Sequence, residues 1–468
     1  MRLLTGVSLL AIVACSSPDE AASPPPPSGD NAPEAWNREV TPPSDAEAAA
    51  ARAACDYAAG HLPAETHGAS ERQGAAIPID HVVIVMMENR SFDHYFQKLP
   101  EYGQPDVEVA PADFTNPDPD GLPVGTFRDE GYCFVDTAHG HGSTMAQVND
   151  GAMDGFVVTS EGNHELPVGG TLEMLKGDRA LSYYDERDIP FYYWLANEFS
   201  IGDQYFSSIP GPTWPNRVYL YAATSFGETS NVLVEAGERP TVLDYLELRG
   251  VSWKLYASTT ASLGIVVDKL FEFNQLGRIV SVSEYFVDAA NGTLPQVAFV
   301  EPGIGREAHD ANDEHPPAIM QIGQKFVAEV VDALTKSPHW SRSALFLTYD
   351  EHGGLYDHVA PPPACRPDDL AAESGFAFDR LGVRVPFIVV SPYARKHHVS
   401  HRVYDHASIV RFLEARFVMP AMTGRDANAE APFDMFDFDS PAFLDPPAIA
   451  IPPVDANVLA SCKAIFEG

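Results

Sequence analysis

Two short polar segments of the chain carry side chains of the kinds that bind metal ions. Glu88 and Asn89 come directly after the apolar run at residues 81–87. Asp350 and Glu351 follow a second apolar run in the same way. Apolar runs of this length are typical of buried strands, and the ligands of open α/β sheets bind beyond the carboxyl ends of strands. Four oxygen donors at two such ends predict a site for a hard divalent cation.

The charges of these side chains also favour a bound cation. Three carboxylates that pack together repel one another and raise each other's pKa, and a divalent metal ion removes that repulsion. Gly353 and Gly354 let the chain turn tightly beside the second pair. The alternative is that the acids only cap loops or helix N-termini. The occurrence of both segments in one chain favours the metal site.

A third segment offers a nucleophile. Residues 208–217 contain several prolines and a glycine, which predict a rigid loop. Thr213 stands just before an expected helix, where backbone N–H groups and the helix dipole favour anions. A hydroxyl at this place can attack a substrate, because a metal and the dipole stabilise its alkoxide. The alternative is that Thr213 is merely the N-cap of the helix.

The elements that must position these residues alternate along the chain. Runs of apolar residues predict strands, and periodic apolar stripes predict helices. Strands are expected over residues 81–87, 252–257, 296–300, 343–349 and 385–390, and helices over residues 216–225, 241–249, 318–337 and 405–417. This alternation predicts an α/β fold with a mostly parallel sheet that is covered on both faces.

The composition places limits on the partners of the chain. Its 468 residues are 45% hydrophobic, which suffices for one large α/β domain or two ordinary ones. The net charge is −36. Such an acidic surface repels nucleic acid, so we expect no DNA or RNA partner. An anionic substrate would have to be attracted by a local feature such as a bound cation.

The first fifteen residues are typical of an export signal. A basic start, Met1-Arg2, precedes an apolar stretch over residues 3–14 that is too short to span a bilayer. The stretch ends in Ile-Val-Ala-Cys, which resembles a bacterial lipobox, so Cys15 would become the lipidated first residue. We therefore predict a lipoprotein signal peptide over residues 1–15 and an exported, membrane-anchored protein that faces the periplasm or the cell surface. An ordinary signal peptide is the alternative.

Composition also suggests how the rest of the chain is divided. Residues 16–75 are rich in Pro, Ala, Ser and acids and predict an extended tether. One folded domain is expected over residues 76–468. It contains an insertion around residues 101–180 with little regular structure, and a tail rich in Pro and Asp begins near residue 423.

Four cysteines remain beyond Cys15, namely Cys55, Cys133, Cys365 and Cys462. An even number in an exported chain predicts two disulfides, for which three connectivities are possible. None of the four shows the close spacing of a zinc site. We favour Cys55–Cys462 with Cys133–Cys365, because the first bond would join the two ends of the domain.

Several long motifs resemble one known family. From about residue 78 to residue 418 the chain is similar to the bacterial phosphoesterase family, which includes non-haemolytic phospholipases C and metal-dependent acid phosphatases. The resemblance is carried by Glu-Asn-Arg-Ser-Phe-Asp-His-Tyr-Phe (88–96), Pro-Gly-Pro-Thr-x-Pro-Asn-Arg (210–217), Asp-Glu-His-Pro-Pro (313–317), Tyr-Asp-Glu-His-Gly-Gly-x-Tyr-Asp-His (349–358) and the segments 384–393 and 404–414.

The resemblance implies a three-layer α/β/α sandwich like that of alkaline phosphatase. It implies one divalent metal ion, which could be Ca, Mg, Mn or Zn, held by Glu88, Asn89, Asp350 and Glu351. Thr213 would be the nucleophile and the fifth ligand. His315 would be the leaving-group acid or a phosphate donor. The expected substrate-binding residues are Asn89, either His139 or His141, Asn216 and His352.

These features together predict a metal-dependent phosphoric ester hydrolase that acts through a phosphothreonine. Its substrate would be a phosphate mono- or diester, or a phospholipid, although the chain lacks the large C-terminal extensions of many phospholipases C in the family. Membrane contact would come through the lipid on Cys15. The alternative is a non-catalytic surface lipoprotein that binds phosphate or a partner. A pure binder has no need of a nucleophile, and the sequence does not indicate the oligomeric state.

Overall fold

One large sheet forms the centre of the computed structural model, which describes residues 30–259, 277–304 and 308–467. Within these residues the sheet has eight strands in the order β12-β6-β11-β10-β1-β9-β7-β8. All of them run parallel except β11, which is antiparallel to both of its neighbours. The strands are β1 (His81–Met87), β6 (Ser200–Gly202), β7 (Trp253–Ala257), β8 (Ile279–Ser281), β9 (Val297–Glu301), β10 (Ser343–Tyr349), β11 (Phe387–Val390) and β12 (His398–Ser400).

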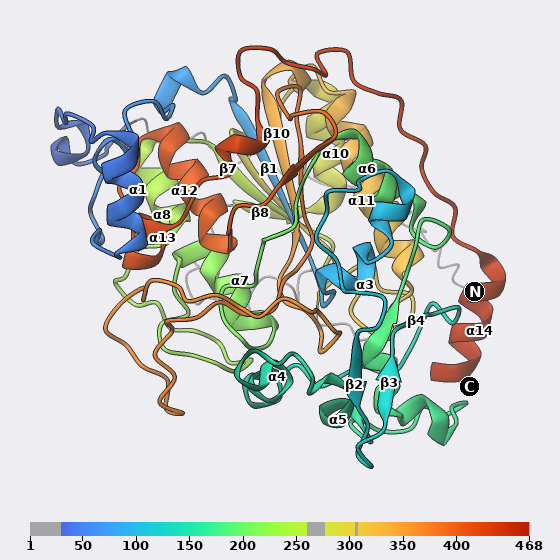
Figure 1. Cartoon of the computed structure of the whole chain (residues 1–468). Coiled ribbons are helices and arrows are strands. Elements are labelled where there is room, and N and C mark those ends of the chain that lie inside the picture. Colours follow the sequence, from blue (N-terminus) through green and yellow to red (C-terminus); the bar gives the residue numbers. More distant parts are fainter. Residues whose placement is uncertain (1–29, 260–276, 305–307, 468) are drawn as a thin grey trace, which may run out of the picture.

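Helices cover both faces of this sheet (Figure 1). On one side α7, α8 and α12 contact one another, and on the other side α11 contacts both α6 and α10. Their bounds are α6 (Pro190–Glu198), α7 (Thr213–Ala222), α8 (Val242–Arg249), α10 (Val282–Asn291), α11 (Met320–Thr335) and α12 (His406–Phe417). The arrangement confirms the expected three-layer α/β/α fold with a mostly parallel sheet.

The central strands are apolar on both faces because helices pack on both sides. Every residue of β9, β10 and β11 is buried. Helix α11 turns its apolar stripe, which includes Phe326, Val330 and Leu334, into this core. Helix α12 begins at a capping box formed by Asp405 and Ser408.

The pairing of β1 with β10 brings the two polar segments together. Met87 pairs with Tyr349 at the end of the register, so that Glu88 and Asp350 leave the sheet side by side. The amide of Asp350 donates a hydrogen bond to the carbonyl oxygen of Met87 at 3.1 Å. The sheet therefore fixes the relative positions of both segments.

The expected tether is wrong from residue 30 onward, because the chain there packs against the domain. Helix α1 (Asp45–Ala53) contacts α13 (Gly424–Asn428), and Arg52 of α1 forms an ion pair with Glu430. Trp36 is buried, and its ring lies 4.8 Å from that of Tyr245. The shorter elements of this segment are η1 (Glu34–Asn37), α2 (Pro63–Thr66) and η2 (Gly74–Ala76). Residues 1–29, with the expected signal peptide and Cys15, lie outside the described residues.

The insertion lies at the end of the sheet toward which β1 runs (Figure 1). It contains short elements, which are β2 (Thr115–Pro117), β3 (Pro123–Gly125), β4 (Phe127–Arg128), α4 (His141–Val148) and α5 (Phe156–Ser160). Strand β4 pairs with β5 (Ser182–Tyr183), and α3 (Phe92–Phe96) directly follows β1. The C-terminal tail crosses the surface to α14 (Ala456–Phe466). Within the described residues, no helix is both long enough and apolar enough to cross a membrane.

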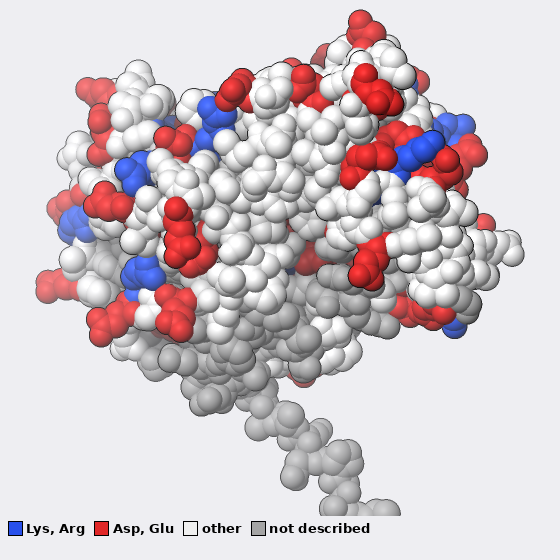
Figure 2. Space-filling view, turned by 90° about the horizontal axis from the view of Figure 1, so that it is seen from below, with Lys and Arg blue, Asp and Glu red and all other residues white. Residues whose placement is uncertain are grey.

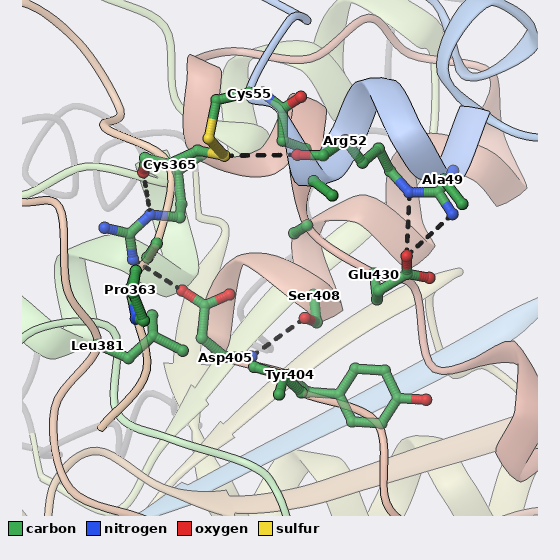
Figure 3. Close-up of a pocket in the computed structure, with 16 residues that line it drawn as sticks. Ala49, Arg52, Cys55, Pro363, Cys365, Leu381, Tyr404, Asp405, Ser408 and Glu430 are labelled. Atoms are coloured by element: carbon green, nitrogen blue, oxygen red, sulfur yellow. Dashed lines mark hydrogen bonds and ion pairs between the residues drawn. A yellow bond between two sulfur atoms is a disulfide. The ribbon is translucent and has the colours of Figure 1, made fainter. Parts of the chain in front are cut away.

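Two disulfides are present, but their connectivity differs from the favoured one. Cys55 bonds to Cys365, and Cys133 bonds to Cys462, with Cα–Cα distances of 5.5 and 6.1 Å. Cys55 follows α1, which lies beside the loop that carries Cys365, as Figure 3 shows. Cys462 lies on α14, which packs against the insertion. Each bond therefore joins one terminal segment to the body of the domain, and the two ends are not joined to each other.

Candidate active site

The polar segments after β1 and β10 form one buried site. Both the amide of Asn89 and that of Glu351 donate hydrogen bonds to Asp350 Oδ1, at 3.1 and 2.7 Å. Glu88, Asn89, Asp350 and Glu351 are all buried. The four oxygen-bearing side chains predicted to hold a metal ion are thus brought together.

Two backbone features allow this close approach. Asn89 has a φ of 60°, in the left-handed region that asparagine tolerates better than most residues. Gly353 has a φ of 65°, and a Cβ there would lie 2.5 Å from the carbonyl oxygen of Asn89. Only glycine can therefore occupy this position without a shift of the loop, as its place in the motif predicts.

Thr213 is the first residue of α7, and its side chain does not cap that helix. The N-cap is Pro212, and no side chain caps the helix there. The Thr213 hydroxyl points instead toward Asn89, with 3.5 Å between Oγ1 and Oδ1. The helix N-terminus faces the carboxylates, where its dipole and amides favour a negatively charged substrate. The capping alternative for Thr213 is therefore wrong.

The loop before Thr213 is held by the side chain of Asn216. Its Nδ2 donates hydrogen bonds to the carbonyl oxygens of Gly211 and Pro212 at 3.0 and 3.1 Å, and its Oδ1 accepts one from the amide of Ile209 at 3.0 Å. The side chain of Asn216 thus contacts the loop backbone instead of facing a substrate, which differs from the expected substrate-binding role.

The same loop is anchored from behind by Arg425 and Asp405. Arg425 Nη1 donates a hydrogen bond to the carbonyl oxygen of Ser208 at 2.9 Å, and the Ser208 hydroxyl donates one to Asp405 Oδ2 at 2.9 Å. Arg425 also bonds the carbonyl oxygen of Cys365 at 2.6 Å. Arg425, Asp405 and Cys365 line a cavity of about 300 Å³ beside the Cys55–Cys365 disulfide (Figure 3). The cavity is separate from the candidate site.

Arg217 joins the nucleophile helix to the carboxylates. Its Nε lies 3.1 Å from Asp350 Oδ2 and 3.6 Å from Glu88 Oε1, and its Nη1 forms an ion pair with Glu301. Its Nη2 donates a hydrogen bond to the carbonyl oxygen of Met86 at 3.0 Å. Because Arg217 lies one helical turn after Thr213, these contacts fix the start of α7 against the ends of the strands.

One arginine does not balance the acids around it. Burial raises the pKa of Glu88 well above its ordinary value, and Asp313 and Asp350 add to that rise against the opposing effect of Arg217. Burial likewise raises the pKa of Asp350 to about 6, with a further contribution from Glu351. Burial also raises the pKa of Asp313 to about 6.

These residues fit a divalent cation. Glu351 Oε1 and Asp313 Oδ2 are buried and have no hydrogen-bond partner among the described residues. The donor set of Glu88, Asn89, Asp350 and Glu351 consists of oxygens, which suits a hard ion. A bound cation would supply the positive charge that the raised pKa values indicate is missing.

Two histidines from other segments stand at the edge of this site. His139 Nδ1 is 2.7 Å from the carbonyl oxygen of Thr137, so Nε2 faces the site, 3.3 Å from Asn89 Nδ2 and 4.0 Å from Glu351 Oε1. Burial alone would lower the pKa of His139, but Asp136 and Glu351 outweigh it and raise that pKa to about 9. The ring of His315 lies 5.6 Å from that of His139.

The other candidate histidines do not face this space. His141 Nδ1 contacts the carbonyl oxygen of Pro210, so His139 is the one of the pair that reaches the site. His352 is fully buried, with Nε2 2.8 Å from Gln147 Oε1 and Nδ1 3.2 Å from Glu351 Oε2. It therefore supports Glu351 from behind.

Three residues of the site lay within the motifs but were given no role from the sequence. Arg217 follows Thr213 by four residues, and this spacing places both on one helix face. Asp313 precedes His315, and its Oδ1 accepts a hydrogen bond from the His315 amide at 3.1 Å. His406 is buried, and its Nε2 lies 2.8 Å from the carbonyl oxygen of Asp350. No local pattern in the sequence indicates this last contact.

Known proteins similar to this chain include plant and bacterial enzymes. Non-specific phospholipase C6 of Arabidopsis thaliana is 35% identical over 392 residues, which cover 78% of this chain and 73% of the relative. Phospholipase C B of Mycobacterium tuberculosis is 29% identical over 477 residues and 88% of each chain. A solved structure, described as a protein in the alkaline phosphatase superfamily from Vibrio parahaemolyticus, is 14% identical and covers 60% of this chain and 79% of that one, with a TM-score of 0.33.

The family model named Phosphoesterase family matches residues 79–420, which include all the motifs of the candidate site. This range corresponds closely to the resemblance found in the sequence. The chain belongs to the Phosphoesterase family and is a phosphoric ester hydrolase.

Proposed function

We propose that the chain is a metal-dependent phosphodiesterase of the phospholipase C type that acts through a phosphothreonine at Thr213. One observation carries this proposal. The hydroxyl of Thr213, at the N-terminus of α7, points toward Asn89, beside a buried group of carboxylates that outnumber the cationic groups next to them, Arg217 and His139. A nucleophile, a cation site and an anion-favouring helix end together suit phosphoryl transfer.

The residues that would hold the cation are Glu88, Asn89, Asp350 and Glu351, with Thr213 as the fifth ligand. A divalent cation bound there would lower the pKa of the Thr213 hydroxyl and would offset charge on the phosphoryl oxygens. The amide of Thr213, the dipole of α7 and His139 Nε2 orient the phosphoryl group. Asp136, 3.6 Å from His139 Nδ1, helps to keep this imidazole protonated.

In the first step Thr213 Oγ1, after its proton is released to solvent, attacks phosphorus, and the bond from phosphorus to the alcohol oxygen breaks. His315 donates a proton to that oxygen, so the alcohol leaves neutral. The Nδ1 of His315 is 2.6 Å from the carbonyl oxygen of Pro316, which leaves Nε2 for this transfer. In the second step water attacks the phosphothreonine, His315 accepts a proton from the water, the bond from phosphorus to Thr213 Oγ1 breaks, and Oγ1 takes up a proton from solvent to restore the hydroxyl.

The comparisons support a phospholipid as substrate. The relatives from Arabidopsis thaliana and Mycobacterium tuberculosis are both named phospholipases C. The mycobacterial relative matches over 88% of each chain, so the matched part accounts for most of a protein named a phospholipase C. The leaving alcohol would then be a diacylglycerol. Two disulfides support export to an oxidising compartment, with Cys15 as the proposed lipid-bearing residue.

Substitution of Thr213 tests the proposed nucleophile. Thr213→Ala should lower kcat by about a thousandfold or more, because loss of a nucleophile removes the covalent route. Thr213→Ser should retain measurable activity. Wild-type enzyme quenched during turnover of a radiolabelled diester should carry label on Thr213. Unlabelled protein, or an active Thr213→Ala variant of unchanged fold, would contradict the proposal.

A side-by-side assay separates the substrate classes. Turnover of p-nitrophenyl phosphate, p-nitrophenyl phosphorylcholine and phosphatidylcholine is measured before and after chelation, and again after return of each of Ca²⁺, Mg²⁺, Mn²⁺ and Zn²⁺. We expect the two choline diesters to be hydrolysed faster than the monoester, and only with metal. Preference for the monoester would indicate a phosphatase, and binding of phosphate without turnover would favour a non-catalytic lipoprotein.

A further inference from the structure

Exposed apolar side chains lie on two loops that flank the candidate site. Within the described residues, large apolar side chains rarely reach the solvent to the extent seen at Val168 and Leu172, which are 80% and 76% exposed. Three more exposed apolar residues belong to the same loops. Together the five form what we call the apolar rim, which consists of Leu166, Val168, Leu172, Val232 and Leu233.

One loop of the apolar rim is attached beside the nucleophile. Asn231 Oδ1 accepts a hydrogen bond of 2.9 Å from the amide of Trp214, the residue after Thr213. Val232 and Leu233 follow Asn231 directly, and consecutive Cα atoms are about 3.8 Å apart. These two side chains therefore lie next to the N-terminus of α7.

The other loop is attached beside His139. His164 Nε2 lies 3.4 Å from Asp136 Oδ2, and Asp136 in turn contacts His139. Leu166 follows two residues later, which places its Cα within about 7 Å of that of His164. The apolar rim thus has members on both the Thr213 side and the His139 side of the site.

The second loop holds its apolar side chains in a fixed place. The amide of Gly162 donates a hydrogen bond to the carbonyl oxygen of Leu175 at 2.9 Å, which closes the loop at its base. The amide of Gly169 donates one to the carbonyl oxygen of Ile465 in α14 at 2.8 Å, which anchors its far end. The exposure of Val168 and Leu172 is therefore built into the fold.

The charge of this face favours contact with a zwitterionic lipid surface over contact with an anionic one. Figure 2 shows the face at the insertion end of the molecule, where an uncharged band runs between acidic groups. Glu165 and Glu173 are exposed beside the apolar rim, and the net charge of the chain is −36. Acidic groups repel anionic lipids, whereas the outermost group of a phosphatidylcholine surface is a quaternary ammonium cation.

We propose that the apolar rim is the surface by which the enzyme docks onto aggregated zwitterionic phospholipid. Apolar side chains on both sides of the site would enter the headgroup region and bring the phosphodiester to Thr213. This inference rests on the proposed function, because it assumes a phospholipid substrate. Apolar contacts supply the attraction here, since a strongly acidic chain gains none from anionic headgroups.

The test uses the double variant Val168→Asp/Leu172→Asp of the full chain. Its matched control is Val287→Asp/Leu444→Asp, at positions 56% and 54% exposed. Val287 lies on α10. Leu444 follows Phe443, whose carbonyl oxygen accepts a hydrogen bond from Trp340. Trp340 lies just before the start of β10, so Leu444 is at the end of the sheet opposite to the candidate site. Binding is measured by sedimentation with phosphatidylcholine vesicles and with vesicles containing phosphatidylglycerol. Turnover is measured on dihexanoyl phosphatidylcholine below and above its critical micelle concentration.

Wild type and control should bind the phosphatidylcholine vesicles, bind the anionic vesicles more weakly, and turn over faster above the critical micelle concentration. The rim variant should lose about tenfold or more in vesicle binding, together with the rise in turnover, because each lost apolar contact weakens binding several-fold. Its turnover of soluble p-nitrophenyl phosphorylcholine should stay within about twofold of wild type. The milder pair Val168→Ser/Leu172→Ser repeats the test if the aspartates impair folding.

Equal binding of wild type and rim variant, or equal losses in the control, would overturn the proposed docking surface. So would stronger binding of wild type to the anionic vesicles. In each of these cases hydrolysis of the soluble diester would leave the proposed function standing. If the wild-type enzyme hydrolysed no diester at all, the proposed function itself would be contradicted.

Discussion

Two groups of buried acids lie at the carboxyl end of the sheet, and they differ in how their charge is balanced. Both groups place carboxylates from the segments that follow β1 and β10 within reach of an arginine. The site cluster consists of Glu88, Asp313, Asp350 and Glu351 around Arg217. The Arg384 cluster consists of Asp93, Asp357, His358 and Arg384.

The Arg384 cluster contains as many basic side chains as acidic ones. Arg384 bonds Asp93 and Asp357 at 3.1 and 2.9 Å, and His358 Nδ1 bonds Asp93 at 2.6 Å. Burial alone would raise the pKa of Asp93, but Arg384 and His358 outweigh it and lower that pKa. Two acids thus face two bases in this cluster. The ligand atoms of Asp93, Asp357 and His358 nevertheless lie within 4.8 Å of one another, a spacing that could also hold a metal ion.

The site cluster sets four acids against Arg217 and His139, whose Nε2 lies 4.0 Å from Glu351 Oε1. The pKa values of Glu88, Asp313 and Asp350 are all raised, whereas of the two carboxyls in the Arg384 cluster only Asp357 has a raised pKa. Short distances between carboxylates and histidines occur in the Arg384 cluster and also among Asp136, His139 and His315, so distance alone does not identify a metal site. The excess of buried acids over bases distinguishes the site cluster, and it is the stronger indication that a cation belongs there.

The largest expected effects come from the same substitution made in each cluster. Asp350→Asn should lower kcat/KM by more than about 100-fold, since even second-layer partners of a metal contribute 10- to 100-fold. Asp357→Asn should instead lower the free energy of unfolding by about 3–5 kcal/mol, because it leaves part of the buried charge of Arg384 unopposed. Steady-state kinetics and urea unfolding of both variants measure the two effects.

Metal affinity provides the control for this pair. Asp357→Asn should bind the activating metal like wild type, and its activity per folded molecule should be unchanged. Asp350→Asn should bind the metal weakly and unfold at a urea concentration no lower than that of metal-free wild type. An Asp357→Asn variant that lost metal affinity, or an active Asp350→Asn variant, would remove the distinction between the clusters.

Strands with strong apolar patterns could be predicted from the sequence, and the short edge strands could not. β1 and β10 have the predicted bounds, β7 begins one residue later than predicted, and β9 is shifted by one residue. β6, β8 and β12 have only three residues each, too few for a periodic pattern. The sequence does not predict helix α1, because its Ala-rich residues lie within a segment that has the composition of a linker.

The site could be predicted where each residue sits at the end of a strand or a helix. Glu88 and Asp350 have this property, and so does Thr213. The contact of His406 with Asp350, and both disulfide pairings, depend on how distant segments pack, and no local pattern encodes that packing. The roles of His139 and His141 were left open for the same reason.

The pH dependence of stability should also separate metal-free from metal-loaded protein. The pKa values of Asp313 and Asp350 are about 6 in the folded chain, above their ordinary value of 3.8. Between these values the folded state binds more protons than the unfolded state, so the stability of metal-free protein should fall by a few kcal/mol as pH rises. A cation binds the ionised carboxylates, so the stability gained from metal should grow over the same range.

Urea unfolding at pH 4.5 and 7, with chelator and with metal, measures this difference. Burial also raises the pKa of Asp357 to about 6. Asp357 therefore adds the same fall of stability with rising pH to the metal-free and to the metal-loaded protein. The Asp357→Asn variant removes the contribution of Asp357 to the pH dependence of stability. In this variant the pH dependence should still differ between metal-free and metal-loaded protein. A metal-induced gain that did not change with pH would mean that Asp313 and Asp350 do not interact with the cation.

The smallest expected effects compare the two histidines that the sequence could not separate. His139 Nε2 reaches the site cluster, whereas His141 contacts the loop carbonyl of Pro210. His139→Gln should lower kcat by about 10- to 100-fold, because it removes a cationic donor to the phosphoryl group, and His141→Gln by less than about tenfold. Because Asp136 and Glu351 outweigh burial and raise the pKa of His139, the wild-type rate should fall at alkaline pH as its imidazole loses a proton, and this alkaline limb should vanish in His139→Gln but persist in His141→Gln. A larger loss of kcat in His141→Gln than in His139→Gln would show that His141, and not His139, contacts the phosphoryl group. It would also mean that the insertion lies differently over the site cluster.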